Sequence, residues 1–91
     1  METKHLIVSG KVQGVGFRSF TQQTASKYNI VGTVKNLEDG NVEIVAQGTG
    51  EDITLFIKKI HKGPFWFAKV TNVEISDIDK TIEDKSFSII Y

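Results

Sequence analysis

The sequence contains no cysteine, a single proline and a single arginine, and it has no excess of charge of either sign. Without cysteine, the chain has no disulfide, no thiol nucleophile and no thiolate ligand for a metal. Eleven Lys and Arg residues balance eleven Asp and Glu residues, which argues against the basic surface typical of nucleic-acid-binding proteins. The apolar runs are too short to span a membrane, and no signal-peptide pattern is present. We therefore expect a cytoplasmic protein with no nucleic-acid or membrane partner.

The length and composition predict one folded domain spanning residues 1–91. At this length, folding buries about 64% of the surface that the unfolded chain exposes, which is enough for one modest core. The chain is 40% hydrophobic and 24% charged, and these fractions are typical of a globular domain rather than a disordered segment.

Changes in the period of the apolar residues predict five strands and two helices. Strands are expected at residues 5–10, 30–36, 41–47, 69–77 and 86–91, and helices from Phe17 to Asn29 and from Glu51 to a stop at Gly63 and Pro64. The Asp39-Gly40 pair predicts a tight hairpin turn between the second and third strands. Val70 is out of phase with Val73 and Ile75, which indicates a β-bulge in the fourth strand.

The order β-α-β-β-α-β, followed by one more short strand, is that of a ferredoxin-like α+β sandwich. Two helices then cover one face of a mostly antiparallel sheet. The sequence leaves open whether the last strand pairs with the sheet, and at which edge. This fold hosts enzymes, RNA-binding domains and regulatory modules, so the fold alone does not select a function.

The segment with the clearest chemical signal is residues 10–18, Gly-Lys-Val-Gln-Gly-Val-Gly-Phe-Arg, which joins the first strand to the first helix. Glycines let backbone N–H groups at a helix N-terminus approach an anion closely. Arg18 is the only arginine of the chain, and its planar guanidinium matches two phosphate oxygens. A surface arginine beside glycines that only shape a turn explains the same residues equally well. The spacing fits neither a P-loop nor a dinucleotide-binding turn.

A second candidate residue, Asn36, lies at the end of the predicted second strand. The first and second strands of this fold run parallel, so the glycine-rich loop and Asn36 are expected at the same edge of the sheet. An asparagine amide offers both a donor and an acceptor, which suits holding a water in line with a phosphorus atom. Taken alone, Asn36 is better explained as a strand-end residue that caps a turn.

An RNA-binding or anion-sensing module without enzymatic activity is the alternative function. Residues 14–20 superficially resemble the aromatic signature of RRM domains, which share this architecture. In those domains the signature lies on the third strand, whereas here Phe17 and Phe20 fall on the buried face of a helix. The predicted third strand has no aromatic residue.

Residues 12–18, Val-Gln-Gly-Val-Gly-Phe-Arg, and residues 34–42, Val-Lys-Asn-Leu-Glu-Asp-Gly-Asn-Val, together resemble the acylphosphatase family in order, spacing and chain size. The resemblance covers nearly the whole chain. It departs from many relatives at Thr33 and Leu37, which flank the strand end.

The resemblance implies a hydrolase that cleaves the carboxyl-phosphate bond of small-molecule acyl phosphates without a metal or a cofactor. Arg18 would clamp the phosphate and Asn36 would orient the water. The phosphate-binding loop would comprise Gln13, Gly14, Val15, Gly16, Phe17 and Arg18. We expect such an enzyme to act as a monomer.

The remaining ionisable and aromatic residues give weaker signals. His5 and His61 are far apart in the sequence and have no metal-ligand spacing, so we interpret them as surface or helix-terminal histidines. Phe65, Trp66 and Phe67 form a dense aromatic patch that either packs at the core or rim, or shapes the acyl end of a substrate or a partner surface.

Overall fold

Seven elements follow one another in the computed structural model, which describes residues 1–64 and 68–91. They are β1 (Glu2–Lys11), α1 (Phe17–Lys27), β2 (Val31–Asn36), β3 (Val42–Gly48), α2 (Gly50–Lys62), β4 (Lys69–Asp77) and β5 (Phe87–Ile90). This is the order that the sequence predicts. The aromatic patch of Phe65, Trp66 and Phe67 lies outside the described residues. Neither helix in the described part of the chain is long and apolar enough to cross a membrane.

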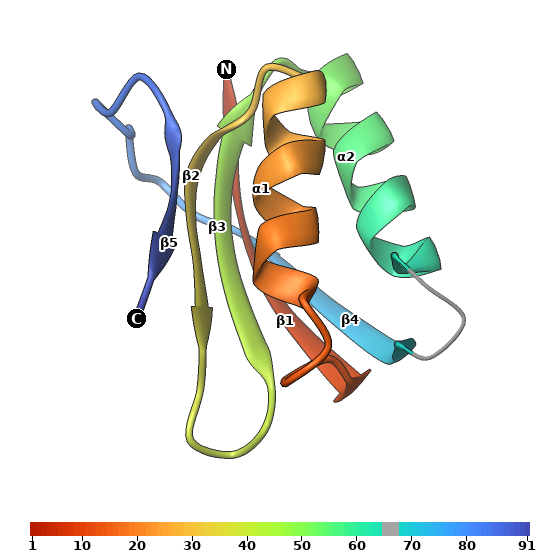
Figure 1. Cartoon of the computed structure of the whole chain (residues 1–91). Coiled ribbons are helices and arrows are strands. Elements are labelled where there is room, and N and C mark those ends of the chain that lie inside the picture. Colours follow the sequence, from red (N-terminus) through yellow and green to blue (C-terminus); the bar gives the residue numbers. More distant parts are fainter. Residues whose placement is uncertain (65–67) are drawn as a thin grey trace.

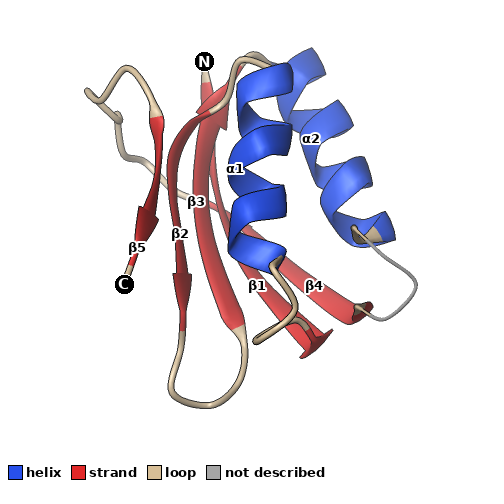
Figure 2. Ribbon diagram, viewed as in Figure 1, coloured by secondary structure: helices blue, strands red, loops and turns tan. Residues whose placement is uncertain are grey.

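The five strands form one sheet in the order β4-β1-β3-β2-β5, and both helices cover the same face of it (Figures 1 and 2). The pairs β1–β4, β1–β3 and β2–β3 are antiparallel. The predicted ferredoxin-like α+β fold is thus confirmed. The terminal strand, whose partner the sequence leaves open, pairs in parallel with β2 at the edge, with Lys35 opposite Ile90.

The core lies between the helices and the sheet, and it follows the predicted periodicity. Val42, Ile44 and Ala46 alternate along β3 and are fully buried, as expected for the face that the helices cover. Phe17 of α1 is 1% exposed and Phe56 of α2 is fully buried. The other large, fully buried side chains are Leu6, Val8, Val12, Thr21, Val34, Ile53 and Ile60.

The predicted bulge is present in β4. Pairing with β1 passes from Ser9 opposite Asn72 to Gly10 opposite Val70, which leaves Thr71 as the extra residue. The extra residue returns Val70 to the face of the sheet that carries Val73. Gly10 is required at this point, because its φ is +124° and an added Cβ would lie 2.0 Å from the carbonyl oxygen of Lys69.

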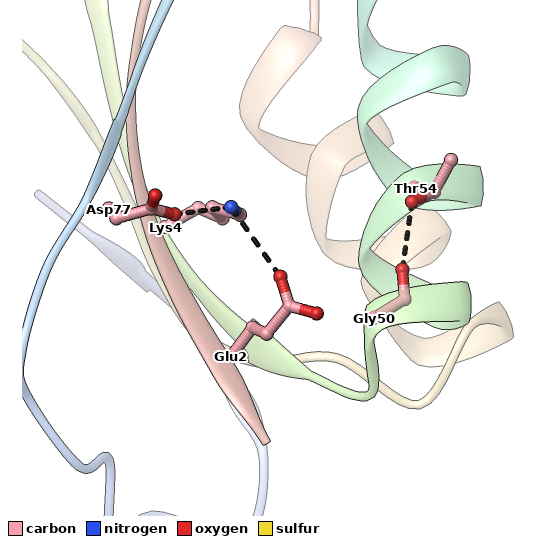
Figure 3. Close-up of polar contacts among 5 residues, drawn as sticks. All are labelled: Glu2, Lys4, Gly50, Thr54 and Asp77. Atoms are coloured by element: carbon pink, nitrogen blue, oxygen red, sulfur yellow. Dashed lines mark hydrogen bonds and ion pairs between the residues drawn. The ribbon is translucent and has the colours of Figure 1, made fainter.

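Strand β1 starts at Glu2, three residues earlier than the apolar pattern predicts. The added residues are polar, but all three pair with β3, and Lys4 lies opposite both Ala46 of β3 and Asp77 of β4. The Nζ of Lys4 lies between the carboxylates of Asp77 and Glu2, 3.5 Å from the Glu2 Oε1 (Figure 3). The hydrogen bond to Asp77 raises the pKa of Lys4. Hydrogen bonding between strands thus extends the sheet beyond its hydrophobic pattern.

Helix α2 has a side-chain cap at its N-terminus. The hydroxyl of Thr49 accepts a hydrogen bond from the N–H of Asp52 at 3.1 Å. The hydroxyl of Thr54 donates to the carbonyl oxygen of Gly50 in the first turn at 2.8 Å (Figure 3). Gly63, with a positive φ of 84°, ends the helix where the sequence predicts.

Residues 78–86 connect β4 to β5 and cross the sheet on the side away from the helices (Figure 1). Gln47 anchors this segment, because its amide oxygen accepts from the Ile82 N–H at 2.7 Å and its amide nitrogen donates to the Ile82 carbonyl at 3.3 Å. Gln47 is expected on the open face of the sheet, yet the crossing segment leaves it only 8% exposed. The same segment carries the chain to β5 at the far edge.

Candidate active site

Strands β1 and β2 both pair antiparallel to β3, one on each side of it, so they run parallel to each other. Their carboxyl ends therefore lie at the same edge of the sheet. The glycine-rich loop leaves β1 after Lys11, and Asn36 is the last residue of β2. The structure thus brings together the two segments that the sequence predicts to meet.

A small pocket of about 110 Å³ lies at this meeting point. Its lining includes four of the six predicted loop residues and also Asn36. The lining residues are Val12, Gly14, Gly16, Phe17, Arg18, Ser19, Asn36, Ile89 and Tyr91. The other two predicted loop residues, Gln13 and Val15, do not line the pocket. The last two residues in the lining, Ile89 and Tyr91, come from the C-terminal end of the chain.

The N-terminus of α1 opens onto this pocket without a side-chain cap. The N-cap residue is Gly16, with φ 78° and ψ 19°, and no side chain accepts a hydrogen bond from the first turn. The first turn of α1 also contains no acidic residue. The first N–H groups of a helix have no acceptor within it, and the helix dipole makes them attractive to an anion. The left-handed conformations of Gly14 and Gly16 are ones that glycine adopts without strain.

The only arginine lies in the first turn of this helix and lines the pocket. The Cζ of Arg18 lies 4.7 Å from the centroid of the Tyr91 ring, a cation–π contact. Among the described residues, no side-chain carboxylate lies within 4 Å of the guanidinium. Its charge is therefore available to a bound anion.

Asn36 contributes a buried polar atom that has no partner within the described part of the protein. Its side-chain Oδ1 is inaccessible and accepts no hydrogen bond. An unsatisfied buried acceptor is costly, and native proteins keep few of them. A rotation of the side chain toward the pocket, where a ligand or water can donate a hydrogen to this oxygen, would remove the cost. The turn-capping interpretation of Asn36 has no support, because no hydrogen bond of its side chain to the turn is present among the described residues.

The side chain of Gln13 has a different environment from the rest of the loop. Its Nε2 donates to the carbonyl oxygens of Leu37 and Asn41, both at 2.8 Å. These two residues close the β2–β3 hairpin, where the Leu37 N–H donates to the Asn41 carbonyl at 2.8 Å. Gln13 therefore connects the glycine-rich loop to the hairpin that follows Asn36.

The histidines and the other cavities lie away from this pocket. His5 is on the open face of the sheet, with its Nε2 2.9 Å from the Glu43 Oε2. Sequence spacing could not reveal this pair, because it forms between adjacent strands. A larger groove of about 630 Å³ lies at the other end of α1, and its one charged lining residue is Lys85. Neither feature combines a positive charge with the uncapped N-terminus of a helix, as the smaller pocket does.

Four pocket-lining residues are not among the predicted site residues: Val12 and Ser19, which flank the predicted loop, and Ile89 and Tyr91, which come from the end of the chain. The pairing of Lys35 with Ile90 brings Tyr91 next to the end of β2 that carries Asn36. No local pattern encodes a parallel pairing between strands 50 residues apart, about half the chain. An aromatic residue directly after the final apolar run is the one available signal.

The fold and this pocket define a small ferredoxin-like α+β domain in which an uncapped helix N-terminus lines a pocket. Residues 4–89 match the acylphosphatase family. An acylphosphatase of Geobacillus thermodenitrificans is 45% identical over 91 residues, covering 100% of this chain and 96% of its own length. One of Oceanobacillus iheyensis is 44% identical over 84 residues, or 92% of each chain. The crystal structure of acylphosphatase from Bacillus subtilis superposes with a TM-score of 0.94 at 40% identity, and each chain is covered fully. The chain belongs to the acylphosphatase family.

Proposed function

We propose that this protein hydrolyses the carboxyl-phosphate bond of small-molecule acyl phosphates, releasing a carboxylate and inorganic phosphate. The observation that carries the proposal is the shared pocket: the open N-terminus of α1, Arg18 and Asn36 line one cavity, and the buried Oδ1 of Asn36 has no partner among the described residues. The family membership of the chain supports the same activity. Residues 1–91 then act as a single catalytic domain.

The phosphate group binds at the loop formed by Gln13, Gly14, Val15, Gly16, Phe17 and Arg18. Backbone N–H groups at the start of α1 donate to its oxygens, and the glycine conformations allow the backbone to approach. The Arg18 guanidinium donates to two oxygens at once and neutralises charge that spreads over the phosphoryl group in the transition state. These groups supply the positive charge that a metal ion would otherwise provide, so we propose that the reaction needs neither metal nor cofactor.

Asn36 orients the attacking water. When the Asn36 side chain turns toward the pocket, its Oδ1, which is buried and unpartnered in the structure, accepts one hydrogen of that water and aims a lone pair of the water at phosphorus. The new bond joins the water oxygen to phosphorus while the bond from phosphorus to the carboxyl oxygen breaks. The carboxylate leaves with the bonding electrons, and the proton of the water passes to a phosphate oxygen. A carboxylate is a stable leaving group, so the site needs no general acid.

Phosphate release from benzoyl phosphate, compared with p-nitrophenyl phosphate, tests this proposal. The leaving group of benzoyl phosphate is a carboxylate, so this substrate should be hydrolysed. The leaving group of the second is a more basic phenolate, and the described pocket lining contains no histidine or carboxyl side chain to protonate it. Equal hydrolysis of both substrates, or of neither, would contradict the proposed activity. An Arg18→Ala protein, assayed in parallel, controls for contaminating phosphatases.

The structure does not favour the alternative of an RNA-binding module. Strand β3, where RRM domains carry stacking aromatics, consists of Val-Glu-Ile-Val-Ala-Gln-Gly. Phe17 is buried in the core and Phe20 packs against it, so neither ring is presented on the sheet. The formal net charge of zero also removes the electrostatic attraction that dominates nucleic-acid binding.

A further inference from the structure

The amide of Gln13 is fully used as a donor, and both of its acceptors belong to the β2–β3 hairpin. The two Nε2 hydrogens go to the carbonyls of Leu37 and Asn41, which lie 24 and 28 residues further along the chain. The hairpin closes on itself at the same place, because the Leu37 N–H donates to Asn41 and the Gly40 N–H donates to Leu37 at 3.3 Å. Gln13 therefore binds the hydrogen-bonded base of the hairpin rather than its tip.

This connection lies between the two halves of the pocket. Gln13 immediately precedes Gly14, which lines the pocket from the loop side. Its acceptor Leu37 immediately follows Asn36, which lines the pocket from the strand side. Within the described residues, no hydrogen bond to the Oδ1 holds the Asn36 side chain in place. The position of the Asn36 side chain therefore depends on the Asn36 backbone. The hydrogen bond from Gln13 holds that backbone at the next residue, Leu37.

Both segments are loops that lie outside the strands and helices, so a contact between them helps to fix their relative positions. Gly14 has a positive φ of 74°, and an added Cβ would meet no atom within 4 Å, so this side of the loop faces open space. The hairpin extends beyond the rest of the sheet near the start of α1 (Figure 1). A displacement of about 1 Å between a nucleophile and its target can reduce a rate by about a hundredfold.

We propose that Gln13 is a positioning residue: its side chain ties the β2–β3 hairpin to the phosphate-binding loop and so holds Asn36 at the right place for attack on the bound phosphate. This inference rests on the proposed function. It assigns the Gln13 side chain to the alignment of the water rather than to contact with substrate, whereas the backbone of the loop binds phosphate. Phosphate affinity and turnover should therefore respond differently when the side chain is changed.

Gln13→Met tests this role, because methionine keeps the length and bulk of the side chain but has no donor. The kcat for benzoyl phosphate should fall about tenfold or more, while the inhibition constant of inorganic phosphate changes by less than about threefold. Gln13→Lys, whose ammonium can donate to both carbonyls, should recover part of the lost kcat. Gln22→Met is the matched control. Gln22 donates to the Phe87 carbonyl at 3.0 Å and does not line the pocket, so its loss should leave kcat unchanged.

A double-mutant cycle with Asn36→Ala shows whether Gln13 acts through Asn36. If it does, Gln13→Met should lower kcat by less than about twofold once Asn36 is already alanine. Three results would overturn the inference. The first is that Gln13→Met lowers kcat by the same factor with and without Asn36→Ala. The others are an unchanged kcat in Gln13→Met alone, or a loss of kcat in Gln13→Lys equal to that in Gln13→Met. Thermal unfolding of each variant separates loss of fold from loss of alignment. If the parent protein does not hydrolyse benzoyl phosphate, or if Asn36→Ala retains its rate, the proposed function itself fails instead.

Discussion

The ring of Tyr91 lies over the guanidinium of Arg18, with 4.7 Å between the Arg18 Cζ and the ring centroid. One residue comes from the first turn of α1 and the other follows β5 at the end of the chain. The parallel pairing of β5 with β2 creates this contact, because it carries the chain end to the edge of the sheet where the pocket lies. The C-terminal strand thus completes a site whose other residues come from the first half of the sequence.

The contact between these residues predicts that Tyr91 helps to hold the guanidinium in the pocket. A cation–π contact at an exposed position is worth about 0.5–1 kcal/mol. Tyr91→Ala should therefore weaken inhibition by inorganic phosphate about two- to fivefold. Tyr91→Phe keeps the ring face and should behave as the parent protein does. Ile90→Ala, which changes an exposed neighbour outside the pocket, serves as the control. Equal behaviour of the alanine and phenylalanine variants would remove this role.

Arg18→Lys should abolish most of the activity even though the charge is kept. An ammonium is a point charge and cannot donate to two phosphate oxygens in one plane, as a guanidinium does. We expect kcat/KM for benzoyl phosphate to fall about a hundredfold or more. Lys35→Arg is a suitable control, because it alters an exposed cation on β2 next to Asn36. A lysine variant with more than about a third of the parent activity would show that geometry at residue 18 is unimportant.

Asn36→Ala should separate phosphate binding from turnover. The loop and Arg18 remain in place, so the inhibition constant of inorganic phosphate should stay within about threefold of the parent value. Turnover should fall about a hundredfold, because the water loses the acceptor that orients it. Asn36→Asp is informative as a second variant, since a carboxylate in the same position should repel the phosphate and weaken binding as well. Hydrolysis by Asn36→Ala at the parent rate would remove Asn36 from the mechanism.

A chelator should leave the rate unchanged if Arg18 and the helix N-terminus supply all of the positive charge at the phosphate. The measurement is hydrolysis of benzoyl phosphate after dialysis against EDTA, with and without added Mg²⁺ or Zn²⁺. A loss of activity that a divalent ion restores would show that the proposed charge balance of the site is incomplete. A rate that is the same in all conditions agrees with it.

Gly32→Ala should destabilise the fold more than Gly40→Ala, although both glycines have a positive φ. Gly32 lies in β2 with φ +144°, and an added Cβ would be 1.8 Å from the carbonyl oxygen of Val45. The two strands would have to separate, and we expect a loss of about 3 kcal/mol or more in the free energy of unfolding. Gly40→Ala is the control, because its turn has open space around it and only backbone strain of about 1–2 kcal/mol is added. Urea denaturation monitored by circular dichroism compares the two.

Elements with strong local signals were predicted well. The apolar alternation of Val42, Ile44 and Ala46 placed β3, and the Asp39-Gly40 turn lies where its residues indicate, with Gly40 at a positive φ of 94°. The boundaries of β1 were wrong by three residues at its start, because cross-strand hydrogen bonds rather than hydrophobic residues define that end. The meeting of the glycine-rich loop with Asn36 followed from topology alone, since strands that flank a common antiparallel neighbour end at the same edge.

The sequence by itself determined the elements, their order and the two segments that face the pocket. These features depend on hydrophobic period, glycine conformation and turn chemistry, all of which act over a few neighbouring residues. Only the tertiary structure decided that β5 pairs with β2 and brings Tyr91 onto Arg18, and that Gln13 donates to the hairpin rather than to the pocket. Contacts of this kind join residues far apart in the chain, and their partners are chosen by the packing of the whole sheet.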